Sequence, residues 1–176
     1  MESAKGAVLS MLADSYRHRD RVGLVAFRGN SADLLLPLCS SVDLAQKRLE
    51  DLPTGGKTPL AAGLAKGMEV LQQEQRKNGE VIPMMVVLSD GRANVPISGD
   101  VRPEVLGIAG KIRAQGIRTV VIDTEETGNS FITFRLGYCR AIAEHTGGGY
   151  YPIADLSAGL LHDITAAERD AMVHPA

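Results

Sequence analysis

The sequence predicts an α/β fold: an open, doubly wound, mostly parallel sheet with one antiparallel edge strand and helices on both faces. Three observations support this prediction. Short apolar runs at 22–27, 84–88 and 118–124 alternate with segments of helical periodicity, as in sheets built from strand–helix–strand units. The core of each run is continuously apolar, which is typical of parallel strands buried on both faces. Two of the runs lead into an aspartate, Asp90 or Asp123.

Length and composition indicate a single globular domain over residues 1–176. The chain is 44% hydrophobic and 23% charged, with a formal net charge of −2, which excludes a largely disordered protein. Lysine and arginine are scattered and aromatic residues make up only 4%, so we expect no nucleic-acid surface. No apolar run approaches the roughly 18 residues that span a bilayer. Cys39 and Cys139 are expected to be free thiols, which favours a cytoplasmic location.

The first part of the chain predicts a helix followed by a β-hairpin. One face of a helix at 3–19 carries Val8, Leu9, Leu12 and Tyr16. A strand at 22–27 is followed by a turn and a second strand at 32–38. Because so few residues join the two strands, they should be antiparallel. Pro37 cannot donate a ladder hydrogen bond, so the second strand should lie at a sheet edge.

Two helices separated by a glycine- and proline-rich loop are predicted next. A short helix begins at Ser41 and ends before the loop at 53–59, which contains two glycines and two prolines. A long helix starts at Pro59, a position where the missing N–H costs nothing. Asn78-Gly79 marks its end. The apolar stripe of this helix consists of Leu60, Leu64, Met68 and Leu71.

The second half of the chain continues the alternation of strands and helices. The predicted elements after the strand at 84–88 are a helix carrying Val105 to Ile112, a strand at 118–124, a helix carrying Leu136 to Ala143, a short strand at 150–153 and a closing helix at about 156–172.

Asp90 is the first candidate site residue. It directly follows the strand at 84–88, and Gly91 allows the backbone to turn sharply behind it. In open α/β sheets, ligands bind beyond the carboxyl ends of the strands, so a carboxylate here suits a binding site. The alternative is that Asp90-Gly91 is only a turn signal.

Thr58 is the second candidate. It precedes the long helix and should lie at a loop rim. A threonine hydroxyl and an aspartate carboxylate are oxygen donors of the kind that hard divalent cations prefer. Alternatively, Thr58 only caps the helix. The neighbouring Gly55-Gly56-Lys57 is not a phosphate loop, because the glycine spacing that this motif requires is missing.

These motifs together resemble the von Willebrand factor A domain, also called the integrin inserted domain. Thr54-Gly-Gly-Lys-Thr-Pro-Leu60 and Val86-Val-Leu-Ser-Asp-Gly-Arg-Ala-Asn-Val95 carry the resemblance. More narrowly, they are similar to the C-terminal domain of the magnesium chelatase D subunit. The segments 22–29, 34–37 and 121–125 share this similarity, so that it covers nearly the whole chain.

The resemblance implies a metal-ion-dependent adhesion site built from three loops. Thr58 matches the threonine of the second loop and Asp90 matches the aspartate of the third. The first loop of the family, Asp-x-Ser-x-Ser, is absent from the sequence. Bound Mg²⁺ or Mn²⁺ should therefore be held only weakly, no better than about millimolar.

The resemblance also implies a function in protein docking. The domain would bind a carboxylate of a partner, namely an AAA+ ATPase subunit or the large porphyrin-binding subunit, in a complex that inserts a metal into a tetrapyrrole. One alternative is a stand-alone interaction protein of this fold with no tetrapyrrole role. Another is that the domain helps to deliver the metal to the chelatase active site. No phosphate loop or nucleophile–base pair is present, so we expect the domain itself not to be catalytic.

The first strand of the family, which is central in its sheet, is also missing, and the chain resembles an N-terminally incomplete domain. Buried strand groups without partners cost roughly 1–3 kcal/mol each, whereas a whole domain is stable by only about 5–15 kcal/mol. The vacant position should therefore close, or be filled by strand addition from another chain, which would produce an oligomer.

Overall fold

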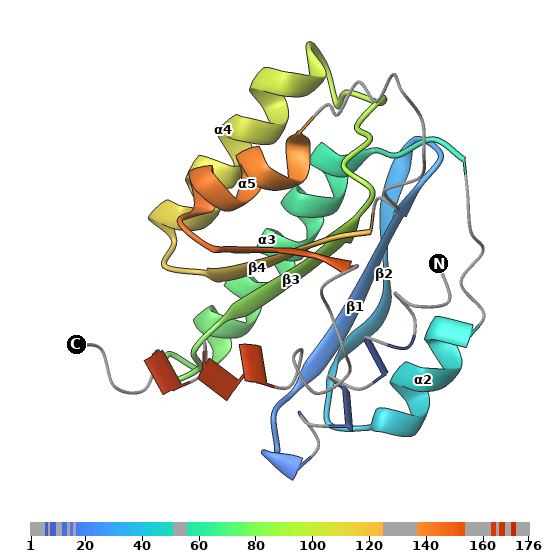
Figure 1. Ribbon diagram of the computed structural model, residues 1–176. Coiled ribbons are helices and arrows are strands. Elements are labelled where there is room, and N and C mark those ends of the chain that lie inside the picture. Colours follow the sequence, from blue (N-terminus) through green and yellow to red (C-terminus); the bar gives the residue numbers. More distant parts are fainter. Residues whose placement is uncertain are drawn as a thin grey trace. The chain divides into compact units, whose positions relative to one another are not determined.

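The computed structural model (Figure 1) describes residues 6, 8–9, 12–13, 15, 17–50, 56–124, 137–153, 163–164, 166–167 and 170–171. The chain forms two compact units. Unit 1 contains Met1–Ala26, Leu34–Thr54 and Asp155–Ala176, and unit 2 contains Phe27–Asp33 and Gly55–Ala154. In the described part of the chain, no helix has the length and apolar character required to cross a membrane.

The predicted hairpin is present. Strands β1 (Val22–Arg28) and β2 (Ser31–Cys39) pair with each other. Only Gly29 and Asn30 connect them, and Gly29 has a φ of +65°. A two-residue connection of this kind makes the pair antiparallel, as the sequence indicated.

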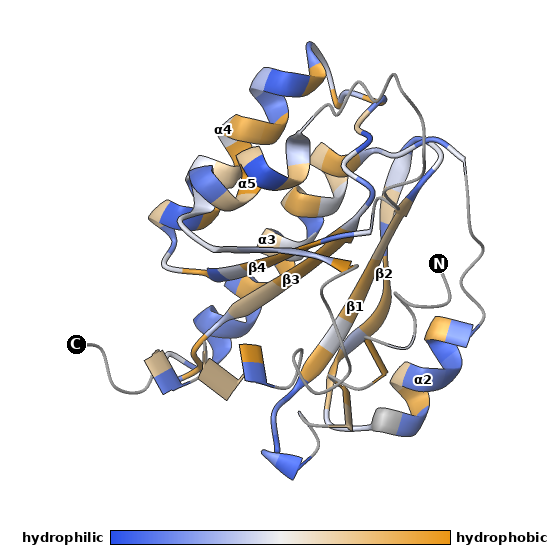
Figure 2. Ribbon diagram, viewed as in Figure 1, coloured by the Kyte–Doolittle hydropathy of each residue, from blue (hydrophilic) through white to orange (hydrophobic). Residues whose placement is uncertain are grey.

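Unit 1 has its own small core. Helix α2 (Val42–Glu50) contributes two of the buried residues, and the Ser41 hydroxyl accepts a hydrogen bond at 3.3 Å from the Leu44 N–H of its first turn. Both hydrophobic and hydrophilic residues occur along α2 (Figure 2), as expected for a helix with one buried face. The buried residues of this core are Leu12, Leu36, Ala45 and Leu49.

Unit 2 contains the parallel sheet. Strands β3 (Met84–Ser89), β4 (Arg118–Asp123) and β5 (Gly149–Pro152) lie in the order β3-β4-β5, and both pairings are parallel. In this register Ser89 lies opposite Asp123. The carboxyl ends of β3 and β4 therefore lie side by side, and the parallel pairing is the one predicted for the sheet.

Three helices pack on the sheet of unit 2: α3 (Leu60–Lys77), α4 (Val101–Ala114) and α5 (Tyr138–Thr146). Buried residues of all three join Met85 and Val87 of β3 and Val121 of β4 in one apolar cluster, so the helices share a face of the sheet (Figure 1). Val120 and Ile122 point to the opposite face and are also fully buried. Strand β4 is thus buried on both faces, which confirms the α/β prediction.

Strand β3 departs from the prediction of burial on both faces. Met85, Val87 and Ser89 are buried, whereas Met84, Val86 and Leu88 are only half-buried. Among the described residues, β3 has a ladder partner in β4 only. The half-buried residues point to the face opposite the one that packs against α3, α4 and α5, so that face of β3 is less completely covered.

The predictions for the cysteines and for the last two helices agree with the structure where it describes the chain. Neither Cys39 nor Cys139 takes part in a disulfide. Gly137, in the left-handed region at a φ of +65°, precedes α5, so that helix starts at Tyr138. The predicted helical residue Leu136 lies outside the described residues. Of the closing helix predicted at about 156–172, the described residues 163–164, 166–167 and 170–171 are helical.

Candidate metal centre

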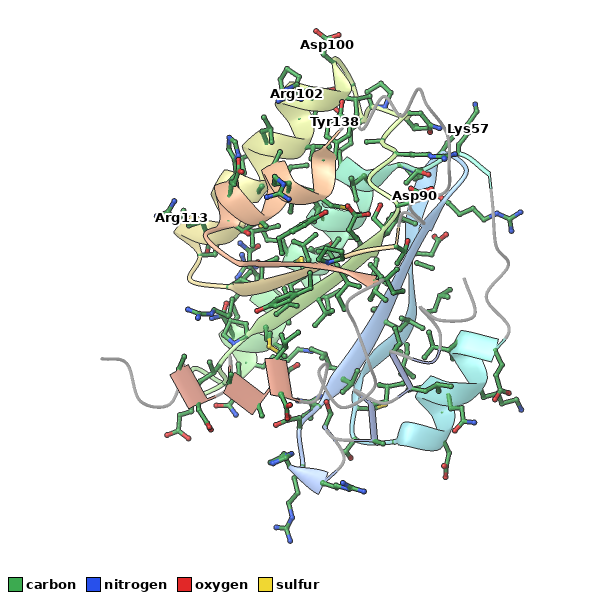
Figure 3. The ribbon with its side chains drawn as sticks, in the orientation of Figure 1. Lys57, Asp90, Asp100, Arg102, Arg113 and Tyr138 are labelled. Atoms are coloured by element: carbon green, nitrogen blue, oxygen red, sulfur yellow. The ribbon has the colours of Figure 1, made fainter. Side chains whose placement is uncertain are left out.

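Asp90 lies at the carboxyl end of β3, where the backbone turns tightly (Figure 3). The Ser89 carbonyl accepts a hydrogen bond from the Thr124 N–H at 2.9 Å, which holds the end of β3 to the end of β4. The Gly91 N–H donates to the Ser89 hydroxyl at 3.1 Å. Gly91 has a φ of +69°, and a Cβ there would lie 3.4 Å from the sulfur of Cys139. The left-handed φ favours a glycine behind the candidate carboxylate, whereas a Cβ at this distance from Cys139 would make an ordinary van der Waals contact.

The Asp90 carboxylate is accessible and weakly paired. Its Oδ1 accepts a hydrogen bond from the Arg92 N–H at 3.0 Å, and its Oδ2 lies 3.7 Å from the Arg92 Nε. The side chains of Asp90 and Arg92 are 42% and 69% exposed. Ion pairs this exposed contribute little free energy, so a cation could displace Arg92 from Asp90 at small cost.

Thr58 lies on the loop that enters α3, and its backbone is bonded to the loop that follows β3. The Thr58 N–H donates to Oδ1 of Asn94 at 2.8 Å, and the Thr58 carbonyl accepts from the Asn94 N–H at 3.3 Å. The structure therefore brings the Thr58 loop against the loop that begins at Asp90. This contact joins residues 36 positions apart.

The helix-cap alternative for Thr58 does not describe the structure. Helix α3 starts at Leu60, and its N-cap is Pro59, one residue after Thr58. Pro59 makes no side-chain capping bond, and its carbonyl accepts the first helical bond, from the Gly63 N–H at 3.0 Å. Thr58 is thus a loop residue outside the helix.

The carboxyl end of β4 carries a second polar group. The Tyr150 hydroxyl donates to Oδ2 of Asp123 at 2.7 Å, and the Arg140 guanidinium lies 4.6 Å from the centre of the Tyr150 ring. Burial and this hydrogen bond to a carboxylate raise the pKa of Tyr150 to about 12. The sequence placed Asp123 at a strand end but gave no signal for its partner.

The far end of the loop that follows β3 is braced by Glu104 of α4. The Glu104 carboxylate accepts hydrogen bonds from the N–H groups of Ile97, Ser98 and Gly99 at 2.6, 2.7 and 2.6 Å. The Ser98 hydroxyl adds a fourth at 3.1 Å. These bonds hold the pKa of Glu104 below its ordinary value.

The donors on these loops suit a hydrated magnesium ion. Thr58 and Asp90 offer a hydroxyl and a carboxylate, and Mg²⁺ keeps several waters when it binds through one or two carboxylates. In the described ranges, no three residues of the types His, Cys, Asp and Glu gather as a metal cluster. The described residues thus supply few ligands, and an ion held by them would retain much of its water.

Sequence reasoning proposed Thr58 and Asp90 as ligands but did not single out Asn94, whose side chain accepts a hydrogen bond from the Thr58 N–H. Asn94 ends the Asp90-Gly-Arg-Ala-Asn run that carries the family resemblance. Nothing in one sequence shows that its side chain reaches back to Thr58. The link depends on how two loops meet, which local patterns do not encode.

Two relatives have sequences similar to nearly all of this chain. An uncharacterized protein, MJ0910, from Methanocaldococcus jannaschii is 46% identical over 164 residues, which is 93% of this chain and 92% of that protein. A magnesium-chelatase 67 kDa subunit from Chlorobaculum parvum is 39% identical over 170 residues, 90% of this chain. The chain spans only 26% of that subunit.

Fold and family comparisons agree with each other. A solved structure described as von Willebrand factor type A, from Catenulispora acidiphila, matches 98% of this chain and 38% of its own chain, with a TM-score of 0.66 at 15% identity. At this identity the likeness concerns the fold alone. The family model of the von Willebrand factor type A domain matches residues 1–92, a range that includes Thr58 and Asp90. This chain belongs to the von Willebrand factor type A domain family and is related to magnesium chelatase subunits.

Proposed function

We propose that this protein is a docking module that binds a carboxylate of a partner protein through a divalent ion held by Thr58 and Asp90. The observation that carries the proposal is the paired contact between Thr58 and Asn94, which brings the Thr58 loop against the Asp90 loop. Both candidate ligands therefore belong to one braced group of loops in unit 2.

Each residue has a defined part in this function. Asp90 supplies a negative charge for the cation, and Thr58 supplies a neutral oxygen. When bound, the ion would offer an open coordination position to a partner's Asp or Glu, giving ion-dependent and directional affinity. Arg92 neutralises Asp90 otherwise, so Arg92 has to move aside when a cation binds.

The relationship to magnesium chelatase subunits suggests the kind of complex in which the domain acts. The 39% identity over 90% of the chain supports a place in a chelatase-like complex, with an AAA+ ATPase subunit or a porphyrin-binding subunit as partner. In such a complex the domain would contribute docking, while ATP-driven insertion of a metal into a tetrapyrrole would be carried out by other parts.

A second candidate is a stand-alone interaction protein of the same fold. It is favoured by MJ0910, of which this chain covers 92%. A relative of similar length indicates that a domain of this size also occurs outside the much longer chelatase subunits. This candidate keeps the metal site but has no tetrapyrrole role.

Metal and partner binding test the proposal directly. Titration with Mn²⁺, followed by electron paramagnetic resonance, should show one weak site, no tighter than about millimolar. Asp90→Ala should abolish it. Asp43→Ala removes an exposed carboxylate from α2 and should leave it unchanged.

A pull-down with the AAA+ subunit of a magnesium chelatase then tests the partner. Capture should require Mg²⁺ and disappear in EDTA or with Asp90→Ala. Capture that is equal with and without divalent ions would refute ion-dependent docking. Ion-dependent capture of other proteins, with no chelatase subunit among them, would support the stand-alone candidate.

A further inference from the structure

Asn94 binds both backbone polar groups of Thr58. Its side-chain Oδ1 accepts the Thr58 N–H at 2.8 Å, and its own N–H donates to the Thr58 carbonyl at 3.3 Å. We propose that Asn94 is a positioning residue: it holds Thr58 where its hydroxyl can ligate the same ion as Asp90. The inference rests on the proposed function, since it concerns the same metal site.

Thr58 needs such support because it lies outside regular structure. Helix α3 begins two residues later, so helical bonding does not fix the Thr58 N–H. On its carboxyl side, Pro59 is fully buried and restricts the backbone of the residue before it. On its amino side, the Lys57 carbonyl accepts from the Gly29 N–H at 3.1 Å. The Thr58 carbonyl also accepts from the Leu60 N–H at 3.0 Å, and the Asn94 side chain fixes the N–H of Thr58 itself.

Asn94 can do this because its own loop is braced at both ends. Near β3, the Ser89 hydroxyl and the Asp90 carboxylate accept the N–H groups of Gly91 and Arg92. At the far end, Glu104 accepts three successive N–H groups. A loop held in this way keeps the side-chain Oδ1 of Asn94 at a defined position.

The chemistry of the link selects a side chain with an oxygen acceptor. Thr58 presents a donor, so an asparagine or an aspartate of the same length satisfies it, whereas alanine leaves it unpaired. Because the Asp90 loop holds Thr58, the two candidate metal ligands are positioned as a pair. Loss of the link should move Thr58 without disturbing Asp90.

Amide exchange of Thr58 in the metal-free protein tests the link, read by NMR. Asn94→Ala should raise the exchange rate of the Thr58 N–H roughly fivefold or more, the ratio expected for losing a typical hydrogen bond. Asn94→Asp keeps the acceptor and should restore protection. Asn78→Ala makes the same chemical change at another exposed backbone-binding asparagine, whose Oδ1 accepts from the Glu80 N–H. That variant should leave Thr58 exchange unchanged.

Mn²⁺ affinity of the same variants provides the second measurement. Asn94→Ala should weaken binding at least severalfold, while Asn94→Asp should bind as tightly as wild type or tighter. Unchanged Thr58 exchange in Asn94→Ala would overturn the inference, whatever the metal does. Faster exchange combined with no metal binding by the wild type would retain the positioning of Thr58 and refute the proposed function instead.

Discussion

At the scale of single residues, the proposed metal site uses side-chain oxygen atoms whose removal should cost the fold little. The described hydrogen bonds of Thr58 involve its backbone N–H and carbonyl. Thr58→Val keeps the side-chain shape, so the free energy of unfolding should change by no more than about 0.5 kcal/mol. Mn²⁺ affinity and partner capture should fall severalfold, and Thr58→Ser should retain them. If Thr58→Val unfolds the domain in a thermal melt, Thr58 is structural and not a ligand.

At the scale of elements, α3 approaches the end of β1 through a glycine. A Cβ at Gly63 would overlap the Phe27 ring, at 2.7 Å from Cγ. Gly63→Ala should therefore destabilise the protein by about 1–3 kcal/mol, although alanine favours helices. Gly107→Ala in α4 meets no atom within 4 Å and should stabilise it by up to about 1 kcal/mol. Urea unfolding would measure the free energy of unfolding of both variants. Equal effects would mean that the Phe27 ring can move aside to admit a methyl group at Gly63.

The brace between α4 and its preceding loop should make stability depend on pH. The folded-state pKa of Glu104 is lowered from its ordinary 4.5 by hydrogen bonds from the loop. The ionised form is thus favoured in the folded protein, and its stabilisation is present above pH 4.5 and lost as the pH falls through the lowered pKa. Glu104→Gln should unfold at lower urea than wild type at pH 7, and this difference should shrink below about pH 4. A difference that stays constant with pH would contradict this role for Glu104.

At the scale of the whole molecule, the edge of β3 that faces away from β4 is the feature that favours self-association. In the described residues its only ladder partner is β4, and unpaired strand edges attract other strands. We predict that the 176-residue chain self-associates or has a lower melting temperature than a version extended at its N-terminus. A version extended upstream by roughly 20 residues, with a strand and an Asp-x-Ser-x-Ser loop, should be monomeric, melt at a higher temperature and bind Mn²⁺ more tightly. Light scattering and thermal melts compare the two. Equal melting temperatures and two monomers would show that the edge of β3 does not drive self-association.

The sequence by itself determined the alternation of strands and helices, because periodicity and apolar runs follow from which faces are buried. It also placed Thr58 and Asp90 on loops, since glycine, proline and strand ends are local signals. Only the tertiary structure decided that Asn94 binds Thr58, that Tyr150 binds Asp123, and that Glu104 braces residues 97–99. The first two contacts join loops and strands far apart in the chain, and the third depends on how one loop folds back onto its helix. Their geometry follows from packing and strand register, and no local pattern of residues records it.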